Sequence, residues 1–326
     1  MDQQRLALTC AFIMVGLLTS VNASAQSSTA PSRRDTPQAV PRTPDGRPDL
    51  QGTWTNPYTA TPLERPAQLA DKAFFTEQEA RDWENGAYQR LLKALPAPEL
   101  TGELLWLDEW KVAESRRTSL IVDPPTGKVP ELTAVAKQRV AAKPPRRADD
   151  PEDQGLSERC ITPTWNNMES AIGPPMLPNL VCCNFYQIVQ TPGFFVIMSE
   201  TFNTVRVVRV GGRHLPPTLR PWVGDSIAHW EGDTLVVDTT NVSPHTRFKE
   251  STERLHVVER FRRTDPQTLV YTFTVNDPDT WTQPWTAEIL FKATDARIFE
   301  FACHEANYSL ANVLRGARVR DQSSRN

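Results

Sequence analysis

Two glutamates lie where acid–base chemistry would place them, among apolar residues of predicted strands. Alternate side chains of a strand face the same side, so Glu200 shares a side with three apolar residues of the run 194–200. By the same count Glu259 lies with three apolar residues of the run 255–261. Burial there would raise a carboxyl pKa toward neutrality, as a general acid or base requires. The alternative is an ion pair, for which the arginine partners are Arg206, Arg260 or Arg262.

Two of the five histidines are the best candidates for a proton shuttle, because an unperturbed imidazole titrates near neutrality. His229 directly precedes the segment 230–233, and His304 follows a predicted strand. In the resulting hypothesis Glu200 or Glu259 is the base and a histidine is the acid. Arg206 holds an anionic group or a developing oxyanion. An exposed or structural role is the alternative for each histidine.

Tryptophan is unusually frequent, with nine copies against five tyrosines. Four of the nine lie in turns of the strand-rich half, at Trp222, Trp230, Trp281 and Trp285. Aromatic walls with a few polar groups suit a hydrophobic or aromatic small molecule, so we expect Trp230, Trp281 and Trp285 to contact substrate together with Arg206. Large aromatic side chains also fill barrel ends as ordinary core, and both interpretations stay open.

No metal and no cofactor is expected. Cys303, His304 and Glu305 are consecutive potential ligands, but successive strand residues point to opposite faces and cannot converge on one ion. A phosphate-cradling glycine-rich loop is absent from the sequence, so nucleotide cofactors are not implied. The segment 224–226 (GDS) is similar to the nucleophile block of a class of lipases and esterases, but its place among predicted hairpins favours a turn.

Composition indicates a globular chain. Of 326 residues 39% are hydrophobic and 23% are charged, and 28 prolines against 14 glycines indicate long, stiff connections. The 36 basic and 39 acidic residues give a net charge of -3, which leaves no basic surplus to bind a nucleic-acid backbone.

The N-terminus has the pattern of a signal peptide. An apolar run at 6–18 follows Arg5, and residues 23–25 are the small residues that signal peptidase accepts, so residues 1–25 are predicted to be removed. A run of about 13 residues is too short to span a bilayer. We therefore expect a periplasmic or secreted protein without an integral membrane segment.

In that oxidising compartment four cysteines permit two disulfides in three connectivities: Cys160, Cys182, Cys183 and Cys303.

The mature chain divides into three predicted parts. Residues 26–47 are polar and proline-rich, which predicts a disordered leader. Residues 48–157 form an extended and helical N-terminal arm that packs on a barrel, with a helix from the capping pattern of Thr76 and Glu79 to residue 95. Residues 158–326 form the β-barrel domain with a C-terminal helix.

The second half of the chain alternates with period two, in short runs separated by turn residues. Strands are predicted at 185–190, 194–200, 204–210, 234–240, 255–263, 269–276, 286–292 and 298–303, with a helix at 307–318. The fold is therefore predicted to be mainly β, an antiparallel meander. Closing it into a calycin- or lipocalin-like barrel would remove its exposed edges.

Four segments of the chain resemble a large family of exported bacterial proteins that is mostly uncharacterised. They are 43–54 (TPDGRPDLQGTW), 224–226 (GDS), 230–237 (WEGDTLVV) and 255–261 (LHVVERF). The resemblance extends over nearly the whole mature chain and brings no catalytic residues. It implies a disulfide between Cys160 and Cys303, because the family usually has cysteines at both positions. At Cys182 and Cys183 the family tends to have polar residues.

These observations predict an exported, cofactor-independent barrel protein that binds a small hydrophobic or aromatic compound. A lyase, an isomerase or a hydrolase would fit. Two alternatives stay open. One is a non-catalytic carrier that uses the same lumen. The other is an envelope interaction protein whose proline-rich arms wrap a partner or a second copy of the chain.

Overall fold

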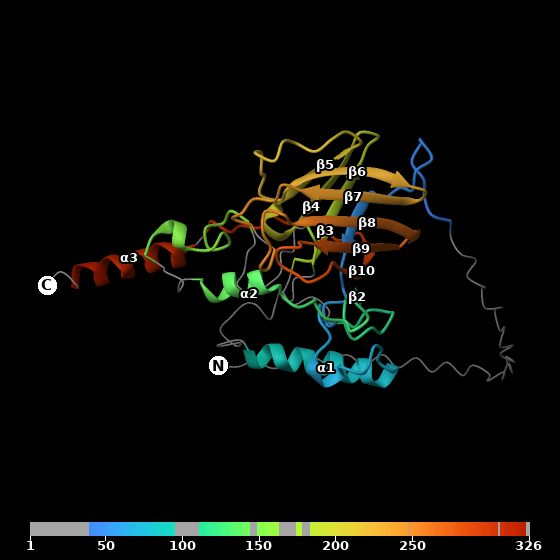
Figure 1. Cartoon of the computed structure of the whole chain (residues 1–326). Coiled ribbons are helices and arrows are strands. Elements are labelled where there is room, and N and C mark those ends of the chain that lie inside the picture. The colour runs from blue at the N-terminus through green and yellow to red at the C-terminus, as the bar shows by residue number, and fades with distance from the viewer. Residues whose placement is uncertain are drawn as a thin grey trace, which may run out of the picture. The chain divides into compact units, whose positions relative to one another are not determined.

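Nine strands close into a barrel in the computed structural model of this protein, and a tenth strand lies outside the closure (Figure 1). The structure describes residues 39–94, 111–143, 149–162, 174–177, 183–246, 248–305 and 307–323. The predicted signal peptide, residues 1–25, and the predicted leader up to residue 38 lie outside these ranges. The closed barrel confirms the predicted fold class.

Eight of the barrel strands follow one another along the second half of the chain. They are β3 (Phe185–Gln190), β4 (Phe194–Ser199), β5 (Val205–Val210), β6 (Asp225–Glu231), β7 (Thr234–Thr240), β8 (His256–Asp265), β9 (Thr268–Asn276) and β10 (Trp285–Thr294). The ninth, β1 (Gly52–Thr55), pairs with both β3 and β10 and closes the barrel. Strand β2 (Ile121–Asp123) pairs with β10. The predicted arm thus contributes a strand to the barrel wall.

Three details differ from the predicted meander. Strand β6 was not among the predicted strands, because its residues were assigned to turns. Strands β5 and β6 pair in parallel, because the crossover segment 211–224 returns the chain to the starting end of β5 before β6 begins. The predicted strand at 298–303 is not a strand. There the backbone N–H groups of Phe299 and Phe301 donate to the side chains of Glu200 and Asn203. Side-chain acceptors satisfy these donors where a ladder partner would otherwise be needed.

The lumen of the barrel is filled with large side chains. The largest buried aromatic residues point inward from six strands: Trp54, Tyr186, Phe195, Phe261, Tyr271, Phe273, Trp285 and Phe291. Their rings contact one another in tilted and edge-to-face arrangements, for example Phe195 on Phe261 with centroids 5.2 Å apart. Burying each such side chain stabilises the fold by roughly 1.5–3 kcal/mol. The interior is therefore a packed core.

Within the described ranges three α-helices accompany the barrel: α1 (Glu77–Ala94), α2 (Ala134–Ala141) and α3 (Tyr308–Ser323). The predicted capping pattern starts α1, since the Thr76 N–H donates to the Glu79 carboxylate at 2.8 Å and the Glu79 N–H to the Thr76 hydroxyl at 3.3 Å. The predicted C-terminal helix is α3. None of the helices in the described ranges combines the length and the apolar character needed to cross a membrane.

Cys160 and Cys303 form a disulfide with their Cα atoms 5.7 Å apart, which confirms the pairing that the family resemblance implies. The bond ties the segment before the barrel to the segment after it. Two ion pairs reinforce this connection, from Arg318 to Asp150 at 2.9 Å and from Arg320 to Asp149 at 3.2 Å. Cys182 lies outside the described residues.

Two segments that carry the family resemblance contact each other, although they lie far apart in the sequence. Arg42, directly before the first segment, donates to both carboxylate oxygens of Asp233, at 3.0 and 2.7 Å. The guanidinium of Arg47 lies 5.5 Å from the ring centroid of Trp230. These contacts fasten the entry to β1 onto the β6–β7 hairpin.

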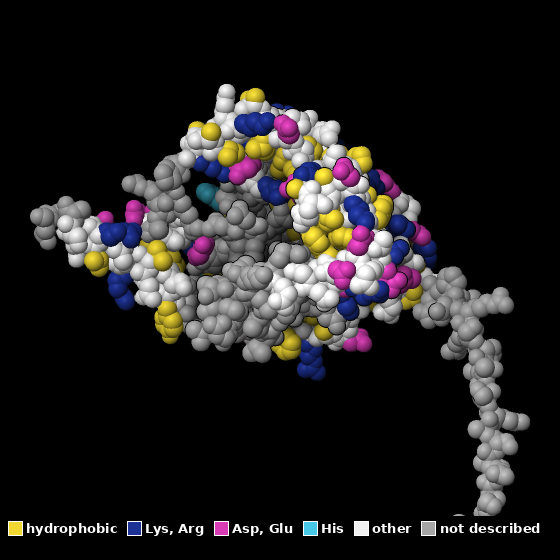
Figure 2. All heavy atoms as spheres, turned by 90° about the horizontal axis from the view of Figure 1, so that it is seen from below, with side chains coloured by type: hydrophobic (Ala, Val, Ile, Leu, Met, Phe, Trp, Pro, Cys, Tyr) yellow, Lys and Arg dark blue, Asp and Glu magenta, His cyan; other side chains and the backbone are white. Residues whose placement is uncertain are grey.

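Charges of both signs are mixed on the face drawn in Figure 2, where Lys and Arg side chains alternate with Asp and Glu side chains over the described residues. This mixture agrees with the near balance of charge in the sequence. A broad positive surface for a nucleic-acid backbone is not visible among the described residues of this face.

Candidate active site

Glu259 lies inside the barrel, as the alternation on its strand predicts. Its carboxylate accepts two hydrogen bonds from the guanidinium of Arg206 and one from the hydroxyl of Tyr271, each at 2.8 Å. All three side chains are buried. The arrangement is the ion pair that the sequence left as the alternative, and it gives the predicted catalytic role of Glu259 no support.

Burial and charge act in opposite directions on this group of residues. Burial lowers the pKa of Arg206, but the attraction of Glu259 outweighs that effect, so the pKa lies above its ordinary value. Burial raises the pKa of the Tyr271 hydroxyl well above its ordinary value. Both donors therefore keep their protons at neutral pH and hold the Glu259 carboxylate in place.

The side of β4 that was expected to face the interior together with Glu200 is the outer one, although Glu200 itself is buried, at 9% exposure. Strand β4 ends at Ser199, and its inward side chains are Phe195, Ile197 and Ser199. Glu200 follows the strand and accepts a hydrogen bond from the Phe299 N–H at 3.3 Å. Its carboxylate thus helps to hold the segment after β10.

The two histidines singled out from the sequence are both exposed. His229 points outward from β6 and bonds to Glu231 at 3.1 Å, with 59% of its side chain exposed. His304 lies in the irregular segment before α3, next to the disulfide. Glu259 points inward from β8, so His229 and Glu259 lie on opposite sides of the barrel wall.

The three predicted substrate-binding tryptophans have different surroundings. Trp281 and Trp285 are buried, with ring centroids 6.1 Å apart in an edge-to-face contact, and they belong to the core. Trp230 is partly buried beneath Arg47. Arg206, which was predicted to bind an anionic group of the substrate, forms a buried ion pair with Glu259. The structure therefore does not bring the predicted site residues together around a shared space.

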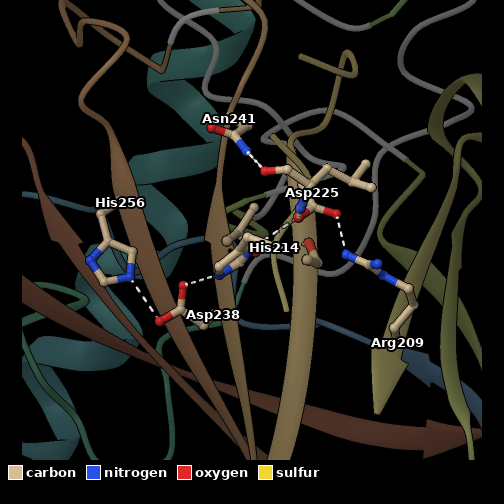
Figure 3. A network of polar contacts seen from close by, with 9 residues as sticks. Arg209, His214, Asp225, Asp238, Asn241 and His256 are labelled. Atoms are coloured by element: carbon tan, nitrogen blue, oxygen red, sulfur yellow. Dashed lines mark hydrogen bonds and ion pairs between the residues drawn. The ribbon is translucent and has the colours of Figure 1, made fainter. Parts of the chain in front are cut away.

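A different set of polar side chains forms a continuous chain of hydrogen bonds on the outer face of the barrel (Figure 3). The imidazole of His214 contacts Asp225 through Nδ1 at 2.9 Å and Asp238 through Nε2 at 3.0 Å. The second oxygen of Asp238 contacts Nε2 of His256 at 2.9 Å. The order Asp225, His214, Asp238, His256 is that of a proton relay with His256 at one end. We call these four residues the relay.

Sheet register and the crossover together position the relay. Asp225 and Asp238 point outward from β6 and β7, near the end of the barrel where β6 begins and β7 ends, and His256 is the first residue of β8. His214 comes from the crossover segment 211–224. Asn241 holds this segment in place by donating to the Leu215 carbonyl at 3.0 Å.

Asp225 is the buried end of the relay, with 5% of its side chain exposed. Arg209 donates to one of its oxygens at 2.7 Å, and the Leu215 N–H donates to the other at 2.7 Å. The middle of the relay is therefore an imidazole held between two carboxylates, one at each ring nitrogen.

His256 is the accessible end, with 37% of its side chain exposed. The hydrogen bond to Asp238 raises the pKa of His256 above its ordinary value. Burial opposes ionisation of Asp238, but the bonds and charges of His256 and His214 outweigh it, so the pKa of Asp238 is lowered. An imidazole oriented by a carboxylate is the usual arrangement of a general acid or base.

The relay was not found from the sequence, because its members come from three strands and a loop. A period-two pattern places Asp238 and His256 outward, but only the register brings them together. Ser226, of the GDS segment, points inward and bonds to Thr239 at 2.8 Å, so it does not face the relay. Within the described ranges no three His, Cys, Asp or Glu side chains are grouped as metal ligands.

We compared the chain with protein-family models, with curated proteins and with solved structures, and none of them matches it.

Proposed function

We propose that this protein is an exported, cofactor-independent enzyme that acts on a small hydrophobic or aromatic compound by acid–base chemistry, with His256 as the residue that transfers the proton. The observation that carries the proposal is the relay from Asp225 to His256. A lyase, an isomerase or a hydrolase needs such a group within hydrogen-bond reach of the substrate.

The geometry supports His256 in this role for two reasons. Its imidazole reaches solvent, whereas the other end of the relay is buried. Its raised pKa keeps more of the ring protonated near neutrality, so His256 is an effective proton donor. Asp225 orients His214 at 2.9 Å, and His214 in turn orients Asp238 at 3.0 Å, so both position His256 indirectly.

Apolar side chains on the crossover segment support a hydrophobic substrate. Leu219 and Trp222 lie on the same segment as His214 and are 52% and 45% exposed. The Trp222 ring lies 6.1 Å from that of His245, and Trp222 is three positions before Asp225 in the sequence. An exposed indole offers a flat apolar surface on which an aromatic compound can stack.

The packed lumen supports a site on the outer face. A carrier that binds its ligand inside the barrel would have to displace buried aromatic side chains and the pair of Arg206 and Glu259. Displacing them would cost packing energy and expose a buried charge pair. A compound that binds at His256 displaces no buried side chain, because this end of the relay is open to solvent.

The test is turnover by the mature chain, residues 26–326, of a panel of aromatic esters, lactones, epoxides and hydroxy acids, followed by mass spectrometry of the products. His256→Gln should lower the rate on any accepted compound by at least about 100-fold, the usual contribution of a positioned acid or base. Asp238→Asn should lower it as well, while the fold by circular dichroism is unchanged.

A second histidine separates this proposal from the sequence-based one. His229 also bonds to a carboxylate on the outer face, at 3.1 Å, but it is not part of the relay. Loss of turnover in His229→Gln with retention in His256→Gln would overturn the proposal. Binding of a panel compound without any product would favour the carrier.

A further inference from the structure

A cleft opens at the end of the barrel where β1 begins and β10 ends. It has a volume of about 500 Å³ and lies between these strand ends and the turn that joins β8 to β9. That volume is within the range of small-molecule sites, which is about 300–1,000 Å³. We call it the polar cleft, after the six polar side chains that line it: Gln51, Thr53, Arg263, Gln267, Thr294 and Asp295.

The closure of the barrel brings these side chains together from three parts of the chain. Thr53 of β1 lies opposite Thr294 of β10, and Asp295 follows β10 directly. Gln267 lies in the turn between β8 and β9, and its carbonyl accepts from the Ala293 N–H at 2.9 Å. This bond ties the turn to β10. The polar cleft therefore exists because β1 pairs with β10 at the rim of the barrel.

Arg263 makes one wall of the cleft rigid. Its guanidinium lies 5.0 Å from the centroid of the Trp54 ring. Each of its three nitrogens also donates to a backbone carbonyl, and the acceptors are Asp49, Asp265 and Pro266. These bonds tie the entry to β1 to the turn after β8. A ligand thus meets a wall that is already ordered, so little conformational entropy is lost on binding.

The other polar groups of the cleft keep hydrogen-bonding capacity for a ligand. Within the described part of the chain, the side chains of Thr53, Gln267 and Asp295 have no hydrogen-bond partner. The Thr294 hydroxyl accepts one bond from a backbone N–H, at 3.1 Å, and can still donate. A primary amide and a hydroxyl both donate and accept, whereas a carboxylate only accepts. Donors and acceptors therefore lie side by side around one space.

The charge and the exposed surface of the lining narrow the class of ligand. Among the described residues that line the cleft, Arg263 and Asp295 are the charged ones, one of each sign, so a net charge on the ligand is not favoured. Trp54 is only 1% exposed beneath Arg263, so an aromatic compound finds no ring on which to stack. A neutral ligand rich in hydroxyl groups fits both observations.

We infer that the polar cleft binds a neutral saccharide. Each sugar hydroxyl donates one hydrogen bond and accepts others, which matches the amide of Gln267 and the hydroxyls of Thr53 and Thr294. The Asp295 carboxylate has two oxygens and accepts from two neighbouring sugar hydroxyls, and such bonds to a charged group are stronger than neutral ones. Recognition at this site rests on hydrogen bonds, in contrast to the stacking proposed at the crossover segment.

The polar cleft and the relay lie at opposite ends of β8. His256 is the first residue of this strand and Arg263 is the eighth, so at about 3.3 Å per residue roughly 23 Å separate them along the strand. A sugar in the cleft does not reach His256. The inference is therefore independent of the proposed function. Sugar binding without turnover would leave the inference standing, and turnover without sugar binding would leave the proposed function standing.

Saturation-transfer nuclear magnetic resonance and calorimetry on the mature chain, residues 26–326, test the inference. The probes are four neutral sugars, namely glucose, galactose, mannose and N-acetylglucosamine, with glucuronate and glucosamine as charged relatives. At least one neutral sugar should bind, and more tightly than both charged ones. Gln267→Ala and Asp295→Ala should each weaken that binding by about 10-fold, because each removes hydrogen bonds to the ligand.

Gln138→Ala is the matched control, since it removes an exposed amide of α2 that is not part of the cleft. It should leave sugar binding unchanged. All three substituted side chains are exposed, so the variants should fold normally.

Three results would overturn the inference. The first is that none of the neutral sugars binds at about 10 mM, where a ligand with a Kd of about 1 mM is mostly bound. The second is that a charged sugar binds more tightly than every neutral one. The third is that Gln267→Ala and Asp295→Ala bind as the wild type does, or that Gln138→Ala weakens binding as much as they do.

Discussion

Arg206 and Glu259 are joined inside the barrel by two hydrogen bonds of 2.8 Å, although 53 residues separate them in the sequence. The first projects inward from β5 and the second from β8, and Tyr271 adds a third bond to the same carboxylate. Neither charge reaches water, so each is compensated by the other. The ion pair therefore fixes the position of β5 relative to β8 inside the barrel.

Removing one partner should be far more costly than removing both. Arg206→Met leaves the Glu259 carboxylate buried without its cation, so the free energy of unfolding should fall by about 3–5 kcal/mol. The double variant Arg206→Met with Glu259→Leu removes both charges and should recover most of that loss. Urea unfolding followed by tryptophan fluorescence measures both effects.

A surface pair provides the control. Arg260 and Glu231 are 2.6 Å apart, with 44% and 49% of their side chains exposed. Arg260→Met should cost no more than about 1 kcal/mol, because water screens an exposed pair. Equal losses in Arg206→Met and Arg260→Met would show that the inner pair does not stabilise the barrel.

The contact of Asp238 with His256 predicts a pH dependence. The pKa of His256 is raised in the folded chain, so the protonated ring stabilises the fold at pH values below its unfolded pKa of about 6.5. This stabilisation is lost as the pH rises from there through the folded pKa. Asp238→Asn should lower the pKa of His256 and remove this part of the pH dependence. Nuclear magnetic resonance of the imidazole protons during a pH titration measures the shift.

Asp279→Asn is the matched variant for the titration, because Asp279 pairs with Arg254 at 2.8 Å and does not contact the relay. It should leave the His256 titration unchanged. An identical His256 titration in the wild type and in Asp238→Asn would contradict the geometry of the relay.

Local patterns predicted the elements whose signals are local. Period-two alternation places β3 at its observed bounds and puts Glu259 inward, because one face of β8 is apolar and the other is charged. The capping pattern of Thr76 and Glu79 correctly starts α1. Each of these signals needs only residues within one turn or one strand.

The same reasoning failed where a local pattern was ambiguous. Both faces of β4 are apolar, so alternation could not tell which one is inside, and the side of Phe194, Val196 and Met198 was wrongly assigned to the interior. The relay could not be predicted either, since it requires the register of three strands and the path of a crossover segment with no periodic pattern.

The disulfide should contribute strongly to stability because it closes a long loop. Cys160 and Cys303 are 143 residues apart, and the loop contains β3 to β10. In the chain-entropy model a bridge over a loop of this size stabilises the folded state by about 4–5 kcal/mol. The double variant Cys160→Ser with Cys303→Ser should lower the free energy of unfolding by that order, as measured by urea unfolding. An unchanged urea midpoint in the double variant would contradict this prediction, because it would show that the bridge does not destabilise the unfolded chain relative to the folded one.

Substitutions of Trp285 and Trp222 should distinguish a core residue from a residue of the proposed site. Trp285 is fully buried and its ring lies 5.8 Å from Phe273 and 6.0 Å from Phe248, so Trp285→Ala should cost about 3–5 kcal/mol. Trp285→Phe keeps an aromatic ring in the core and should cost much less. Trp222→Ala removes an exposed side chain and should change stability by no more than about 0.5 kcal/mol.

For ligand binding the Trp222 variant should have the larger effect, whereas for stability the Trp285 variant should. If an aromatic compound stacks on the crossover segment, Trp222→Ala should weaken its binding several-fold, while Trp285→Phe should leave binding unchanged. Quenching of the remaining tryptophan fluorescence, or calorimetry with a panel compound, measures the affinities. Loss of binding in Trp285→Phe with retention in Trp222→Ala would place the ligand at the end of the barrel where Trp281 and Trp285 meet, and would move the site away from the relay.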